Sequence, residues 1–374
     1  MHEYVKERAL FGRYISEEIW LSIITKLSSK FKVNTLGKSV ESKPVFSVEL
    51  GQGETKILLW SQMHGNESTS TKALFDLLNF FDKNSHSDLL QKFRFYIIPM
   101  LNPDGAFKYT RVNANKVDLN RDAKSLTQPE SIILRNYFEQ IRPSYCFNLH
   151  GQRTIFGTNS FANPATMSFL APAVDNYKTI TDSRSKSMYV IGEVYKALNV
   201  IIPNHIGLYD DAYNANCVGD TFQALKVPTI LFEAGHYHHD YDREFVRKIY
   251  FLALLEAFRA IDNIPINPSK DTYNSIPKNK KCFYDIILRN VILEDFSSET
   301  AIAFQYEERL INNTIHFIPK VVQIGLLHEY FGHREVNCNG AIISGFEDQS
   351  LNENYSNDFV FLNNEKFSLK LIKN

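Results

Sequence analysis

The residues best suited to chemistry follow stretches of apolar and β-branched sequence, and the first group is QMHGNE, residues 62–67. His64 and Glu67 are three positions apart, where a buried strand is expected to pass into a helix. An imidazole nitrogen and a carboxylate oxygen at this spacing can bind one metal ion, and zinc takes ligands of both types. Polar side chains at the end of a buried strand cost stability unless they line a site. His64 and Glu67 are therefore candidate zinc ligands.

Two more chemically capable residues come directly after apolar stretches. His150 follows the expected strand 145–149, and Glu233 follows the expected strand 229–232. The carboxyl ends of the strands in an open α/β sheet lie along one edge, which is where ligands usually bind. We therefore expect His150 and Glu233 to lie near His64 and Glu67.

A third group combines arginines with asparagines. Arg111 is followed by DLNR at 118–121, which contains Asn120 and Arg121, and NPDG occupies 102–105. Arginine guanidinium groups bind carboxylates through two parallel hydrogen bonds. Taken alone, the arginines are typical of a solvated loop and Pro-Asp-Gly of a tight turn. A role for these residues in a site therefore depends on their lying near the other two groups.

The elements that must position these residues alternate along the first 262 residues. Apolar periodicity predicts helices near 12–31, from about 68, and at 130–140, 185–198 and 243–261. Short apolar runs predict strands at 57–60, 93–99, 145–149 and 229–232. We expect Ser68, Thr69 and Ser70 to cap the helix that follows Glu67. The alternation predicts an α/β fold with a mixed, mostly parallel central sheet flanked by helices.

The remainder of the chain has a different character. Residues 263–281 contain three prolines, several asparagines and a basic cluster, as is typical of a linker. Residues 282–374 contain strand-like runs and a plausible hairpin near Asn363 and Asn364. We expect a catalytic domain at 1–262, a linker at 263–281 and a small β-rich carboxyl-terminal domain at 282–374.

Taken together, these motifs resemble the zinc carboxypeptidase (metallocarboxypeptidase) family. The resemblance covers about residues 33–262 and includes LGKSVESKPV at 36–45, which is similar to an early β-hairpin of that family. The residues that carry it are HGNE (64–67), NPDG (102–105), Arg111, DLNR (118–121), His150 and Glu233. Each motif is common by itself, whereas the full set in this order is specific.

The resemblance implies a role for each matching residue. His64, Glu67 and His150 would bind one zinc ion per chain, and Glu233 would be the general base for a metal-activated water. Arg111 would polarise the scissile carbonyl. The roles implied in substrate binding belong to Asn120 and Arg121, which would hold the terminal carboxylate, and to Tyr213 as the capping tyrosine, with Tyr209 as second choice. The implied reaction is hydrolysis of the carboxyl-terminal amide bond of a peptide or small amide substrate with a free carboxylate.

Some positions depart from the family pattern and bear on substrate preference. Asn66 stands where many digestive members have arginine, and Gly151 stands where serine is common. Asp220 lies in the stretch that shapes the side-chain pocket in relatives, although it also suits a helix cap or loop. The alternative function is that of a zinc-dependent N-acyl amino acid deacylase of the aspartoacylase or succinylglutamate desuccinylase type. Those enzymes also have HGNE, an arginine followed by DLNR, and a β-rich carboxyl-terminal domain that residues 282–374 could resemble. A binding module without activity is disfavoured, because no ligand or base is missing.

A second histidine-rich string, HEYFGH at 328–333, is a poor metal motif. The metalloprotease helix needs histidines four positions apart, whereas His328 and His333 are five apart with Gly332 between them. We therefore expect this string to be a surface loop or strand end rather than a second zinc site.

Composition excludes several other classes of protein. The 374 residues carry a formal net charge of −1, which argues against nucleic-acid binding through excess positive charge. Four separated cysteines argue against a thiolate zinc site or a disulfide framework. We find no apolar signal core and no stretch long enough to span a membrane. The expected location is therefore the cytoplasm.

Overall fold

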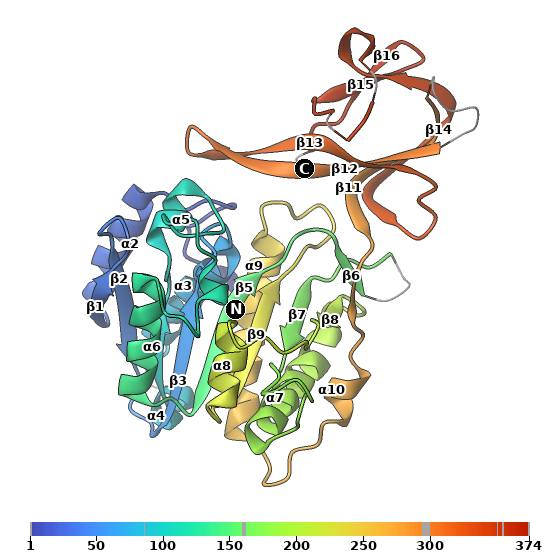
Figure 1. Ribbon diagram of the computed structural model, residues 1–374. Coiled ribbons are helices and arrows are strands. Elements are labelled where there is room, and N and C mark those ends of the chain that lie inside the picture. The colour runs from blue at the N-terminus through green and yellow to red at the C-terminus, as the bar shows by residue number, and fades with distance from the viewer. Residues whose placement is uncertain are drawn as a thin grey trace. The chain divides into compact units, whose positions relative to one another are not determined.

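The computed structural model describes residues 2–85, 87–158, 162–293, 300–349, 351–353 and 355–372 (Figure 1). The chain divides into two compact units, of which the first comprises residues 1–152 and 165–279. The second comprises residues 153–164 and 280–374. Residues 153–164 come from the middle of the chain, yet they pack with the carboxyl-terminal strands.

The first unit is built on a mixed sheet of eight strands in the order β1-β2-β4-β3-β5-β9-β7-β8. The pairs β3–β4, β3–β5, β5–β9 and β7–β8 are parallel, and the remaining neighbours are antiparallel. The strands are β1 (Lys32–Lys38), β2 (Pro44–Leu50), β3 (Thr55–Ser61), β4 (Phe93–Ile98), β5 (Tyr145–Gly151), β7 (Met167–Leu170), β8 (Ile206–Leu208) and β9 (Thr229–Ala234). The expected mixed α/β fold is confirmed.

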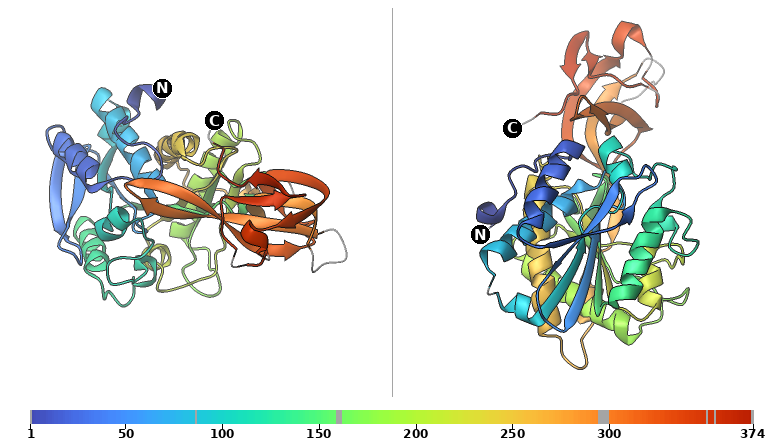
Figure 2. Two further views of the ribbon diagram at one scale, coloured as in Figure 1. Left: turned by 90° about the horizontal axis from the view of Figure 1, so that it is seen from above. Right: turned by 90° about the vertical axis from the view of Figure 1, so that its left-hand side faces the viewer.

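Helices cover both faces of this sheet, as the right-hand view of Figure 2 shows. One apolar core joins the sheet to α2 (Glu17–Ser28), α3 (Ser68–Lys83), α7 (Asp182–Asn199) and α9 (Glu244–Asp262). A second core joins the opposite face to α6 (Pro129–Ile141) and α8 (Val218–Ala224). The shorter helices are α1 (His2–Val5), α4 (Asp88–Lys92), α5 (Pro103–Lys108), the 3₁₀ turn η1 (Leu119–Arg121) and α10 (Asp271–Ser275).

Strand periodicity explains why both faces are covered. Along β3, Ile57 and Leu59 face the first core, while Leu58 and Trp60 face the second. All four side chains have 0% exposure, so this central strand is apolar on both faces, as strands between two helical layers are. None of the helices in the described residues is both long and apolar enough to cross a membrane.

The second unit is a separate β-rich structure, as expected for the carboxyl-terminal region. Among the described residues, one sheet has the strand order β13-β12-β11-β14-β15-β16, in which β11 and β14 pair in parallel, and β6 pairs with β10 in a separate two-stranded sheet. Asn363 and Asn364 both have positive φ and form the turn between β15 and β16. The strands are β6 (Phe156–Thr158), β10 (Asn279–Lys281), β11 (Phe283–Ile292), β12 (Thr300–Ile311), β13 (Thr314–Gly325), β14 (Phe331–Ser344), β15 (Phe359–Leu362) and β16 (Glu365–Ser368), together with the 3₁₀ turn η2 (Phe346–Asp348).

Candidate metal centre

The loop between β3 and α3 carries the first two candidate ligands, His64 and Glu67. Gly65 is packed so closely against α5 that an added Cβ would lie 2.0 Å from the carbonyl carbon of Gly105. The Asn102 side chain holds the same loop by donating to the Met63 carbonyl over 3.0 Å, and it caps α5 by accepting from the Gly105 amide. The NPDG segment therefore begins a helix that supports the HGNE loop, rather than forming an isolated turn.

The helix that follows Glu67 starts differently from the sequence expectation. Glu67 itself is the N-cap residue of α3, and its side chain makes no capping hydrogen bond. Ser68, Thr69 and Ser70 lie inside the first turn instead. The Glu67 carboxylate points to the histidines, because its oxygens lie 2.9 Å from His64 Nδ1 and 3.0 Å from His150 Nδ1.

Three side chains converge in a geometry that suits a zinc ion. Within the described residues, His64, Glu67 and His150 form a group whose ligand atoms all lie within 4.8 Å of one another. The two Nδ1 atoms of the histidines are 3.0 Å apart. Tetrahedral zinc with ligands at ~2.0–2.1 Å needs ligand atoms roughly 3.3 Å apart. The donor set therefore fits zinc after small movements.

Asp118 supports this donor set from outside. Its Oδ1 atom accepts from His64 Nε2 over 2.9 Å, which leaves His64 Nδ1 for a metal ion. Carboxylates commonly bind the far nitrogen of a metal-ligating histidine and fix the orientation of its ring. In the sequence, Asp118 is visible only as the first residue of DLNR, two positions before Asn120, and nothing local links it to His64.

Charge and burial act in opposite directions on the pKa of Glu67. The pKa of Glu67 is affected first by burial, which raises it, but the neighbouring His64 and His150 outweigh burial and hold it below its ordinary value. The Gly151 amide also donates to Glu67 over 2.9 Å. Glu67 is therefore a carboxylate that remains charged and can face a cation.

Glu233 occupies a different environment. It is 8% exposed, and its Oε2 atom is buried without a hydrogen-bond partner among the described residues. Burial and then the charge of Glu67 raise its pKa well above the ordinary value. The strand register places Glu233 on β9 opposite His150 on β5. Glu233 is thus the neighbour of a metal donor across the two strands.

Arg243 fixes the ends of the two strands that carry His150 and Glu233. This fully buried arginine donates to the carbonyl of Ala234 over 2.7 Å and to that of Gln152 over 3.0 Å. Both carbonyls lie just beyond the site residues on β9 and β5. Arg243 is therefore a structural support that the motif reading did not include.

The loop between α5 and α6 brings Arg111 to the metal donors. Its Nη1 atom donates to Glu67 and its Nε atom to Asp118, both over 3.2 Å. The Arg111 side chain is still 49% exposed, so its guanidinium group faces both the donors and solvent. This contact agrees with the expectation that Arg111 belongs to the same site.

Asn120 and Arg121 meet the start of α8. Asn120 accepts from the Val218 amide over 3.0 Å, and Arg121 donates to Cys217 Sγ over 3.1 Å. Asp220 lies in the first turn of α8, where it is 7% exposed and burial raises its pKa to about 7. Asp220 is thus neither the cap of α8, which is Cys217, nor a loop residue.

The two candidate tyrosines differ in their relation to the carboxylates. Burial, followed by the charges of Glu233 and Glu67, raises the pKa of Tyr209, which lies immediately after β8. Tyr213 is half-buried in the segment before α8. The structure shows no hydrogen bond between the Tyr213 side chain and another described residue. Both tyrosines are partly exposed, so burial alone does not choose between them.

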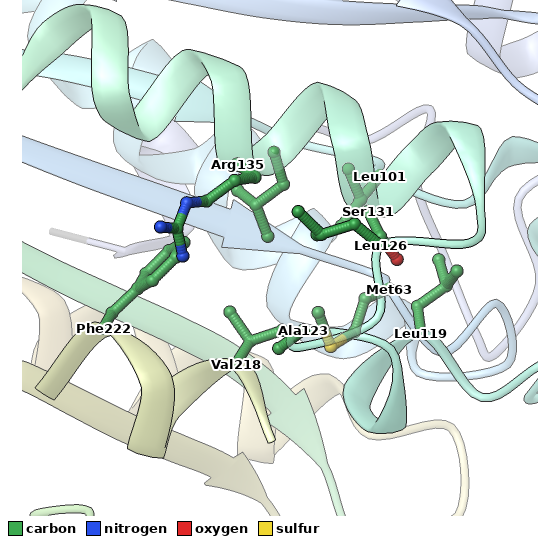
Figure 3. A pocket seen from close by; sticks show the side chains of 10 residues that line it. Met63, Leu101, Leu119, Ala123, Leu126, Ser131, Arg135, Val218 and Phe222 are labelled. Atoms are coloured by element: carbon green, nitrogen blue, oxygen red, sulfur yellow. The ribbon is translucent and has the colours of Figure 1, made fainter. Parts of the chain in front are cut away.

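A small apolar hollow lies between α6 and α8 (Figure 3). Its cavity volume is about 10 Å³, it opens to solvent, and it is lined by Met63, Leu119, Leu134 and Phe222 among others. Met63 and Leu119 are the neighbours of His64 and Asn120 in the chain. The hollow is a gap in the second core and has none of the metal donors on its walls.

The histidines at 328–333 do not form a second cluster. His328 and Glu329 are exposed in the turn between β13 and β14, while His333 Nε2 lies 2.8 Å from the carbonyl of Thr154. The search of the described residues finds no metal group there.

Comparisons with known proteins give the site a context. Residues 17–156 match the model of a family described as zinc carboxypeptidase. This match points to the zinc carboxypeptidases. The matched segment contains His64, Glu67 and His150 but ends before Glu233.

Curated relatives agree with this family match over part of their length. Carboxypeptidase D from Homo sapiens is 29% identical over 178 residues, covering 40% of this chain and 12% of that protein. Carboxypeptidase SOL1 from Arabidopsis thaliana is 30% identical over 149 residues, covering 34% of this chain and 30% of the relative. The chain thus spans a minor part of the zinc carboxypeptidase relatives that it matches.

Solved structures establish the zinc carboxypeptidase fold over a longer stretch. A metallo-carboxypeptidase from Burkholderia cenocepacia has a TM-score of 0.53 at 18% identity, covering 67% of this chain and 70% of the other. The structure of bovine thrombin-activatable fibrinolysis inhibitor in complex with tick carboxypeptidase inhibitor has a TM-score of 0.55 at 14% identity. That match covers 70% of this chain and 100% of the other.

Proposed function

We propose that this protein is a zinc-dependent carboxypeptidase that removes the carboxyl-terminal residue of a peptide. The observation that carries the proposal is the convergence of His64, Glu67 and His150 beside Glu233. The family match and the donor spacing both support zinc as the bound metal. When bound, zinc would activate water at neutral pH and polarise a carbonyl oxygen.

Glu233 acts as the general base in this proposal. Its carboxylate takes one proton from the attacking water and later passes it to the amine that leaves. The strand register supports this assignment, because it places Glu233 beside the metal donor His150. Its unpartnered buried oxygen supports it as well, since that atom is available to the reactants.

Arg111, Asn120 and Arg121 act on the substrate. The Arg111 guanidinium is partly exposed beside the donors and stabilises negative charge that develops on the scissile carbonyl oxygen. Arg121 and Asn120 bind the terminal carboxylate through charge-assisted hydrogen bonds. This clamp restricts cleavage to the end of a chain. Tyr213 remains the candidate capping tyrosine, with Tyr209 as second choice.

The test is mass spectrometry of a mixed substrate pool incubated with zinc-loaded protein. The pool contains free-acid peptides, the same peptides as carboxyl-terminal amides, and N-acyl amino acids, and the control is Glu233→Gln. We expect loss of single carboxyl-terminal residues from the free-acid peptides. Release of amino acids from the N-acyl compounds alone would replace the proposal with a deacylase function.

A further inference from the structure

The segment 109–122 carries Arg111, Asp118, Asn120 and Arg121, yet most of it lies outside regular secondary structure. It joins α5 to the η1 turn, and Tyr109 and Lys116 have positive φ. Arg111 and Asp118 nevertheless meet partners on the HGNE loop at 2.9–3.2 Å. Contacts away from the site must therefore hold this segment in place.

Asn113 forms the centre of those contacts. It is 3% exposed, and its Oδ1 atom accepts from the amides of Asn115 and Val117 over 3.1 and 3.0 Å. Its Nδ2 atom donates to Gln128 Oε1 over 2.8 Å and to Glu130 Oε2 over 3.1 Å. The two donors and two acceptor positions of the amide are all used.

These bonds close one turn and attach it to a rigid element. The backbone N–H of Asn113 donates to the Val117 carbonyl over 3.1 Å, so residues 113–117 form a closed turn. Glu130 lies in the first turn of α6, has 0% exposure and also accepts from the Val40 amide. The turn is thereby anchored between α6 and the β1–β2 hairpin.

The position of the turn in the chain gives these bonds a consequence for the site. Val117, where the turn closes, directly precedes Asp118, and Arg111 lies two residues before Asn113. We propose that Asn113 is a positioning residue, which holds Asp118 against His64 and Arg111 against Glu67. It acts through those residues, since no hydrogen bond joins Asn113 to a metal donor in the described structure.

The substitution that tests this is Asn113→Ala, and the readout is zinc affinity from competition with a chromophoric chelator. Loss of an outer carboxylate contact typically weakens metal binding 10–100-fold. We expect the zinc Kd to rise about tenfold in Asn113→Ala. The matched control is Asn115→Ala, because exposed Asn115 also donates to Gln128 over 2.9 Å but does not close the turn. We expect this control to stay within about twofold of the unmodified chain.

A mutant cycle separates positioning from a general loss of stability. In a background that carries both Asp118→Asn and Arg111→Met, Asn113→Ala should change the zinc Kd by less than about twofold, because both residues through which it acts are already altered. Full additivity of the two effects would overturn the proposal. So would a lower Tm for Asn113→Ala with zinc affinity equal to that of the Asn115→Ala control.

A second variant covers the case in which Asn113→Ala does not fold. Gln128→Met removes one acceptor of the Asn113 amide and keeps the side-chain length. We expect a smaller rise in zinc Kd in the same direction, and an unchanged Kd would count against the proposal. The inference rests on the zinc site of the proposed function. If the unmodified chain binds no zinc, the proposed function fails, whereas tight binding with no effect of these variants refutes the positioning role alone.

Discussion

His150 and Glu233 are direct neighbours across the parallel strands β5 and β9. Adjacent strands lie about 4.8 Å apart, so a metal donor and a protonatable carboxyl group share one edge of the sheet. The two residues are distant in the sequence, and this register alone brings them together.

The first concerns the proposed general base. Glu233→Gln keeps the size of the side chain but removes its ability to take a proton from water. We expect zinc stoichiometry to remain near one per chain while kcat falls by roughly 10²–10⁴-fold. Metal analysis and steady-state kinetics measure both quantities. Glu329→Gln, at a side chain 85% exposed in the second unit, is the matched control. A kcat within threefold of normal would remove Glu233 from the mechanism.

The second concerns the metal ligands and can be measured without a substrate. A ligand that binds only the folded state at 100 times its Kd stabilises that state by about 2.7 kcal/mol. Zinc at that ratio should raise the thermal unfolding temperature of the intact chain. His150→Ala should abolish the rise, because one of three donors is lost. A similar rise in both proteins would mean that zinc binds elsewhere.

The third concerns the carboxylate clamp. Arg121→Met removes the cation but keeps much of the apolar length of the side chain. We expect kcat/KM for free-acid peptides to fall roughly 10–100-fold, since a charge-assisted hydrogen bond contributes about 1.5–3 kcal/mol. Peptides amidated at the carboxyl terminus should be cleaved poorly by both proteins and show little difference. Equal loss on acids and amides would argue that Arg121 does not read the terminal carboxylate.

The fourth concerns pH and the buried Asp220. Burial raises the pKa of Asp220 from 3.8 to about 7, so the folded state binds a proton more tightly than the unfolded state. The stabilisation from this proton is complete below pH ~3.8 and is lost as pH rises through ~7. Between those values, the chain should lose about 1–2 kcal/mol of unfolding free energy that Asp220→Asn does not lose.

Denaturant unfolding at several pH values checks this prediction. The other titrating groups are common to both proteins, so their effects cancel in the difference. Parallel pH profiles for the two proteins would show that Asp220 titrates normally.

Much of the site was predictable because its information is local. Apolar runs identified β3, β5 and β9, and each ends close to a polar residue that could bind metal or move a proton. The order of HGNE, DLNR, His150 and Glu233 along the chain suggested one family before any distance was known. The cap of α3 was predicted wrongly, because the chemistry of Glu67 is set by the distant His150 and not by the neighbouring serines.

The sequence by itself determined which residues are capable of chemistry and which elements carry them, since residue type and periodicity are local properties. Tertiary structure decided which of them meet. Three relationships join residues that are far apart in the chain. Asp118 contacts His64, the charge of Glu233 helps to raise the pKa of Tyr209, and residues 153–158 and 162–164 belong to the second unit. Such contacts depend on strand order, register and loop anchoring, which arise when the whole sheet packs between its helices.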